Sequence, residues 1–139
     1  MQIHSHIPEL EEMLAPWRET LGRDYLAYRN HLYRLLHYAF YLALPEEEAR
    51  QKLIIAACFH DLGIWSDETL DYLPPSVELF RLCDRIDLSW GLIRSGVSAH
   101  FIERVKQSFP NAGFHRRLGY FGWVYFKRHP FNPLPMFRW

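Results

Sequence analysis

The sequence feature that most constrains the fold is an unbroken apolar segment, residues 53–59, that ends abruptly in two polar residues. The segment follows Pro45 and the glutamates at positions 46–48. This pattern is typical of a helix start, because proline suits the first turn and acids suit the positive end of the helix dipole. A helix is therefore predicted from Pro45 to about Gly63, where glycine can end it. Since this helix is apolar on nearly every side, we expect it to be the central buried helix.

The rest of the chain also carries helical signals, and no segment shows the apolar-polar alternation that marks a half-buried strand. Asp24 and Ser98 are each expected to cap a following helix. The fold class predicted is therefore all-α, a single bundle of about five to seven helices. The other predicted helices cover residues 8–21 with a break at Pro16, 24–42, 77–93 with a break near Gly91 or Gly96, 98–110 and 113–128, with a loop at 65–76.

The length of the chain, 139 residues, fits one domain spanning 1–139. Its tail, residues 129–139, contains three prolines, so it is predicted to be irregular and to pack its apolar residues on the surface. That aromatic tail also hints at a homodimer. Cys58 and Cys83 lie in apolar stretches without the close spacing of a metal pair, and we expect both to be reduced core thiols.

The composition excludes several classes of protein. Apolar residues make up 49% of the chain and aromatic residues 17%, which excludes a disordered chain. The formal net charge is zero, which argues against nucleic acid as the partner. No segment is long enough to span a membrane, and the N-terminus lacks the pattern of a signal peptide. We therefore expect a cytoplasmic protein without a membrane partner.

The polar pair that ends the apolar helix is His60-Asp61. An imidazole and a carboxylate beside an apolar core are costly unless each has a partner, and one metal ion supplies a partner for both. Residues at a helix end can share such an ion even though adjacent side chains point about 100° apart. The pair alone also allows a simpler interpretation, a helix-end histidine next to a surface aspartate.

A second histidine, His31, lies in the middle of the preceding predicted helix. The short connection predicts that the two helices pack antiparallel, so His31 can approach His60. Arg34 shares a helix face with His31 and would suit a phosphate oxygen, unless it is an ordinary surface cation. His37 lies off that face and is expected to be structural, while His4 lies in a terminus expected to fray.

Two further carboxylates, Asp84 and Asp87, are three residues apart on one face of a later predicted helix. Either could be an additional metal ligand. Asp84 directly follows an apolar stretch, so it is preferred as the buried ligand. Alternatively, one aspartate is solvated and the other pairs with Arg81 or Arg85.

The order of these residues resembles the HD-domain metal-dependent phosphohydrolases, from about residue 14 to the end of the chain. Residues 55–64 look like that family's apolar helix leading into its His-Asp pair, and residues 28–34 look like its helix with the first histidine. Residues 71–76 and 132–136 are similar to a bacterial subgroup of HD proteins.

The resemblance implies a chemistry and a set of roles. His31, His60, Asp61 and Asp84 would be the ligands of a divalent ion, which could be Mn, Fe, Co, Ni, Zn or Mg. The reaction would be hydrolysis of a phosphate ester, such as a nucleotide or related small molecule, by a metal-activated water. In this scheme Arg34 helps to neutralise the phosphate, and Asp71 or Asp61 orients the attacking water.

One departure from the subgroup limits what the resemblance implies. In proteins of that subgroup, the Pro-Pro-Ser turn is separated from the next helix by a few dozen residues, which often include a His-His pair for a second metal. In this chain Ser76 is followed directly by Val77. Either the segment has been lost, which implies at most one metal ion, or the sequence lacks a natural segment that would form a lid. The alternative functions are a non-catalytic HD-like module that binds a nucleotide or a protein, and an unrelated helical interaction protein.

Overall fold

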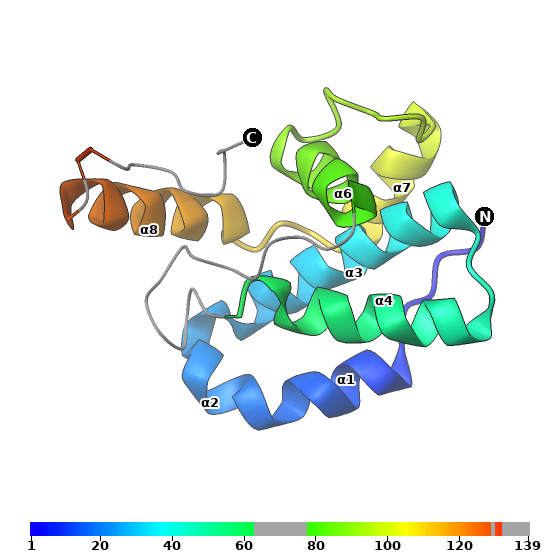
Figure 1. The fold of residues 1–139 in the computed structure, drawn as a ribbon, viewed down its shortest axis with the longest axis horizontal. Coiled ribbons are helices and arrows are strands. Elements are labelled where there is room, and N and C mark those ends of the chain that lie inside the picture. The colour runs from blue at the N-terminus through cyan, green and yellow to red at the C-terminus, as the bar shows by residue number, and fades with distance from the viewer. Residues whose placement is uncertain (63–77, 129, 132–139) are drawn as a thin grey trace.

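The computed structural model describes residues 1–62, 78–128 and 130–131, and within these ranges it contains helices and no strand. This confirms the predicted all-α class. Figure 1 shows the arrangement of the helices. The elements are α1 (Pro8–Leu14), a 3-10 turn (Ala15–Trp17), α2 (Arg18–Leu21), a second 3-10 turn (Gly22–Asp24), α3 (Tyr25–Ala43), α4 (Glu47–His60), α6 (Glu78–Leu88), α7 (Ala99–Ser108) and α8 (Phe114–Arg128).

The central helix is α3, and the prediction that the apolar helix 45–63 is central was wrong. Of the 19 residues of α3, 14 are buried, whereas α4 buries only Leu53, Ile54, Ala57 and Cys58. Helix α4 runs antiparallel to α3, as predicted, and packs against α3 and α1 (Figure 1). Its remaining face is open to solvent, so Ile55 stays 50% exposed and Phe59 40%. The first half of α4, residues 47–52, is polar, so the apolar segment 53–59 alone gave a misleading picture of the whole helix.

The helix ends agree in part with the predicted caps. Ser98 caps α7, since its Oγ accepts a hydrogen bond from the backbone N–H of Phe101 at 3.2 Å. Asp24 stands at the N-cap position of α3 but makes no capping hydrogen bond. Its carboxylate instead lies 2.6 Å from Nε of Arg117, which ties the beginning of α8 to the beginning of α3.

Helix α6 ends at Leu88, earlier than predicted, in a turn with an unusual backbone. Trp90 and Gly91 both have positive φ angles, 57° and 82°. A Cβ atom at Gly91 would lie 2.7 Å from a methyl carbon of Ile102, so glycine lets this turn approach α7 closely.

Several sequence expectations concern residues outside the described ranges. These are the end of the apolar helix at Gly63, the loop at 65–76 and, apart from residues 130 and 131, the tail at 129–139. Cys58 and Cys83 are buried free thiols, as expected. Among the described residues, no helix is long and apolar enough to cross a membrane.

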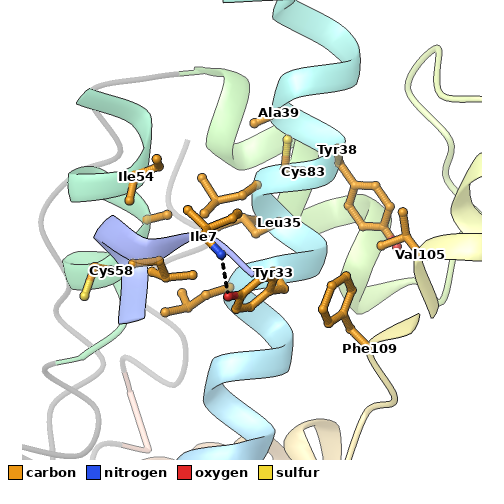
Figure 2. Close-up of a cluster of buried hydrophobic side chains, with 14 of the residues drawn as sticks. Ile7, Tyr33, Leu35, Tyr38, Ala39, Ile54, Cys58, Cys83, Val105 and Phe109 are labelled. Atoms are coloured by element: carbon orange, nitrogen blue, oxygen red, sulfur yellow. Dashed lines mark hydrogen bonds between the residues drawn. The ribbon is translucent and has the colours of Figure 1, made fainter. Parts of the chain in front are cut away.

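The N-terminal segment is held against α3 through Tyr33, so the expected fraying is absent at this end. The Tyr33 hydroxyl accepts a hydrogen bond from the backbone N–H of Ile7 at 3.0 Å (Figure 2) and donates one to Glu11 at 2.6 Å. The backbone N–H of His4 donates to Nε2 of His37 at 2.9 Å. His37 is buried and structural, as predicted.

We expect Tyr33→Phe to lower the free energy of unfolding by about 1–3 kcal/mol, because it leaves the buried N–H of Ile7 without an acceptor. Denaturant unfolding measures this difference. Tyr41→Phe is the matched control, because Tyr41 lies on the same helix as Tyr33. Its ring stacks on Phe101 of α7, and its hydroxyl makes no hydrogen bond among the described residues. Equal stability of the two variants would contradict the anchoring role of the Tyr33 hydroxyl.

Candidate metal centre

Three helices bring together four residues that could hold a metal ion. Helix α3 supplies His31, the C-terminal end of α4 supplies His60 and Asp61, and α6 supplies Asp84. One nitrogen or oxygen atom from each of them lies within 4.8 Å of the others. The structure thus brings together all four residues that were proposed as ligands, including two separated by 53 positions in the chain (His31 and Asp84).

The distances inside this cluster are those of atoms that share one ion. His60 Nε2 lies 3.5 Å from His31 Nε2, 3.0 Å from Asp61 Oδ2 and 3.6 Å from Asp84 Oδ1. His31 Nε2 lies 3.6 Å from Asp61 Oδ2 and 3.7 Å from Asp84 Oδ1. Two ligand atoms at about 2.1 Å from one ion, at octahedral or tetrahedral angles, are about 3.0–3.4 Å apart. The cluster therefore needs only small adjustments to surround an ion.

The end of α4 is fixed by hydrogen bonds to carbonyl groups that have no partner within the helix. The last carbonyls of any helix lack N–H donors from the following turn. Here His60 Nδ1 lies 2.6 Å from the carbonyl oxygen of Ala57, and the Tyr28 hydroxyl donates to that of Cys58 at 2.9 Å. With its Nδ1 donating to Ala57, the His60 ring presents the lone pair of Nε2 to the cluster.

His31 is oriented by a carboxylate behind it. Its Nδ1 lies 2.7 Å from Oδ2 of Asp87, so its Nε2 faces the cluster. Phe114 stacks on the same ring, with 4.1 Å between ring centroids and an interplanar angle of 11°. Such a carboxylate on the second nitrogen of a metal-binding histidine fixes the ring orientation and raises its basicity as a ligand.

Asp87, and not Asp84, is the buried aspartate of α6. Asp84 was preferred as a ligand because it was expected to be the buried one, and that expectation was wrong. Asp87 is 4% exposed, whereas the side chain of Asp84 is 20% exposed and faces the cluster. The three-residue spacing places both on one side of α6, but only Asp87 meets a buried cation. That cation is Arg34, which neither of the two interpretations of this aspartate pair had named as a partner.

Arg34 does not present a free guanidinium to the cluster. Its Nε and Nη2 donate to the two oxygens of Asp87 at 2.5 and 3.0 Å, and Nη1 donates to the backbone carbonyl of Phe109 at 3.0 Å. The side chain is buried. The guanidinium thus holds Asp87 and the chain near Phe109. All three of its nitrogens already donate hydrogen bonds within the protein, which argues against the expected role of Arg34 in neutralising a phosphate.

Charge in the cluster favours a cation among the carboxylates. Burial works against protonated imidazoles, yet hydrogen bonds to Asp61 and Asp87 raise the pKa of His31 above its ordinary value. Burial is likewise outweighed at His60, where the charges of Asp61 and Asp84 raise the pKa well above the ordinary value. The charge of His60 holds the pKa of Asp61 below its usual range in spite of burial. The carboxylates thus favour positive charge at the positions of these two imidazoles.

Among the residues proposed for catalysis, Asp71 lies outside the described residues, so its role stays a prediction. Sequence reasoning missed the joint role of Arg34 and Asp87. The signal was present, because each lies three residues after a cluster residue on the same helix, but it does not show that the two side chains meet. No protein-family model, no curated protein and no solved structure matches the chain.

We expect the protein to bind about one divalent ion per chain, and Asp87→Asn to weaken this binding by about 10–100-fold. Titration of Co²⁺ followed by its visible absorption measures the affinity. Because Asp87→Asn leaves the buried Arg34 unpaired, the double variant Asp87→Asn/Arg34→Gln should be tested as well, since it removes both charges. Asp24→Asn is the control. An unchanged affinity in both folded variants would show that Asp87 does not support His31.

We also expect the affinity for metal to fall as the pH is lowered from about 8 to about 6, because metal ligation requires neutral imidazoles. The raised pKa of His31 and of His60 means that the folded cluster binds protons more readily than free histidines do, so these protons must leave when the metal enters. Calorimetry in two buffers of different ionisation enthalpy measures the released protons. Metal binding without proton release would contradict this description of the cluster.

Proposed function

We propose that this protein is a metal-dependent phosphohydrolase of the HD-domain type. The observation that carries the proposal is the convergence of two imidazoles and two carboxylates on one point, with the His-Asp pair at the end of a helix. The order of these residues along the chain and the resemblance of their surroundings to HD proteins support it. The all-helical fold is consistent with the same family.

The donor set suits ions of intermediate hardness. Two nitrogen and two oxygen donors suit Mn, Fe, Co, Ni or Zn and tolerate Mg. His31, His60, Asp61 and Asp84 would hold the ion. Bound there, the ion would supply Lewis acidity toward a phosphoryl oxygen and toward water.

The charges of the protein suit an anionic substrate once an ion is present. The carboxylates of Asp61 and Asp84 balance a divalent cation, and the carboxylate of Asp87 is balanced by Arg34. The occupied centre would thus carry no excess negative charge to repel a phosphate. In this proposal Asp61 would also orient the attacking water, since only one of its oxygens is needed as a ligand.

The substrate proposed is a small phosphate ester, such as a nucleotide. Because Arg34 is occupied by Asp87, recognition of the phosphate would fall mainly to the ion and to residues outside the described ranges, Asp71 among them. The absence of net charge gives no support to a nucleic-acid substrate. The homodimer and the cytoplasmic location expected from the sequence stay predictions.

We expect protein reconstituted with Mn²⁺, Co²⁺, Ni²⁺ or Zn²⁺ to hydrolyse members of a panel of p-nitrophenyl phosphate, bis-p-nitrophenyl phosphate and nucleotides. Asp61→Asn and His60→Ala should each lower the rate by a factor of at least about 100. His100→Ala is the control, since His100 is exposed and outside the cluster. Stoichiometric metal binding without cleavage of any ester would favour the non-catalytic HD-like module instead.

A further inference from the structure

A second cavity lies beside the metal centre and shares none of its four cluster residues. Its volume is about 290 Å³, and it is bounded by α3, α6, α7 and the chain that enters α8. Arg34 and Asp87 line it, so the buried pair that supports His31 also forms part of the wall of this cavity. The cavity is large enough for a small organic molecule.

The charged side chains that line the cavity are paired with one another. Arg34 is bound to Asp87, and Lys106 Nζ lies 3.4 Å from a carboxylate oxygen of Glu103. Each cation thus has its own anion, and the lining carries no formal net charge. A neutral ligand therefore suits the cavity better than a phosphate or another ion.

Aromatic rings form much of the remaining wall. Trp90 stacks on His115, with 4.8 Å between ring centroids, and the ammonium of Lys106 lies 5.6 Å from the Trp90 ring centroid. Trp90 is 51% exposed, and it holds a left-handed backbone conformation that costs free energy in a residue other than glycine. A large indole kept exposed on a strained turn at the edge of a cavity is suited to stacking on a flat ring.

The wall also contains a tyrosine hydroxyl that makes no hydrogen bond within the described part of the chain. Tyr38 is 1% exposed, and its hydroxyl makes no hydrogen bond among the described residues. Its ring points from α3 toward Val105 of α7 (Figure 2), and the residue lines the cavity. Burial raises the pKa of Tyr38, so the hydroxyl stays protonated and can donate. Its oxygen is not fully enclosed by protein atoms, so it reaches the cavity, where a ligand would supply a hydrogen-bonding partner.

We propose that this cavity is a second binding site, for a neutral, planar aromatic molecule that carries one hydrogen-bonding group. The Trp90 ring would contact the flat face of the ligand, and the Tyr38 hydroxyl would bind its polar group. The site is independent of the proposed phosphohydrolase activity, because none of the four cluster residues lines it.

The test uses 2-naphthol, which is neutral, planar and carries one hydroxyl group, titrated calorimetrically into the metal-free full-length protein. We expect about one molecule to bind per chain. Tyr38→Phe should weaken binding by about tenfold, because it removes one hydrogen bond to a buried group, and Trp90→Ala should weaken it at least as much. Tyr41→Phe, a change of the same kind on the same helix outside the cavity, should bind as wild type does.

Two further comparisons make the test decisive. The anion 2-naphthalenesulfonate should bind at least about tenfold more weakly than 2-naphthol, since the cavity has no unpaired cation. His60→Ala should bind 2-naphthol normally, which separates this site from the metal centre. The absence of saturable binding, equal binding to the Tyr38→Phe variant, or preference for the sulfonate would each overturn the proposal. Thermal unfolding of each variant verifies that it is folded.

Discussion

The structure depends on one buried chain of contacts, in which Arg34 holds Asp87 and Asp87 holds His31. Arg34 and His31 belong to α3 and Asp87 to α6, so this chain fixes the two helices against each other. The link from Arg34 to the carbonyl of Phe109 extends it to the segment before α8. A buried ion pair adds little net stability, but loss of either partner leaves a buried charge that is strongly unfavourable. The interaction therefore specifies how the helices must pack more than it stabilises them.

Helix α3 carries this arrangement because it is surrounded by neighbours. On one side of α3, His31 faces the C-terminal end of α4 and Asp84 of α6, and with them makes up the candidate metal centre. Farther along the helix, Tyr38 lines the second cavity, and Arg34 lines the same cavity while holding Asp87. The polar residues of α3 are satisfied only because other helices bring partners to them from several directions.

Much of the fold and of the candidate site could be predicted from the sequence, and the failures have physical reasons. Helix starts and ends are local, so Ser98 was identified correctly as a cap. The set His31, His60, Asp61 and Asp84 came from the resemblance to HD-domain proteins, since residue spacing alone left both Asp84 and Asp87 open as ligands. The central position of α3 was missed because the prediction weighed the apolar segment 53–59 alone, whereas α3 as a whole is longer and more apolar than α4. Asp24 was taken for a cap, whereas it pairs with Arg117, 93 positions later. The pairing of Arg34 with Asp87 was not predicted either, because the two residues meet only in the folded chain.

The pairing of Asp87 with Arg34 also explains how a third carboxylate can lie so near the candidate metal centre. Asp61 and Asp84 already carry the two negative charges that a divalent ion balances. An unpaired Asp87 would add a third charge, which would favour protonation of the histidines over metal binding and would repel an anionic substrate. Arg34 cancels that charge and leaves the hydrogen bond to His31 intact. The arginine thus lets a carboxylate orient His31 while the net charge of the centre stays fixed by the two ligand aspartates alone.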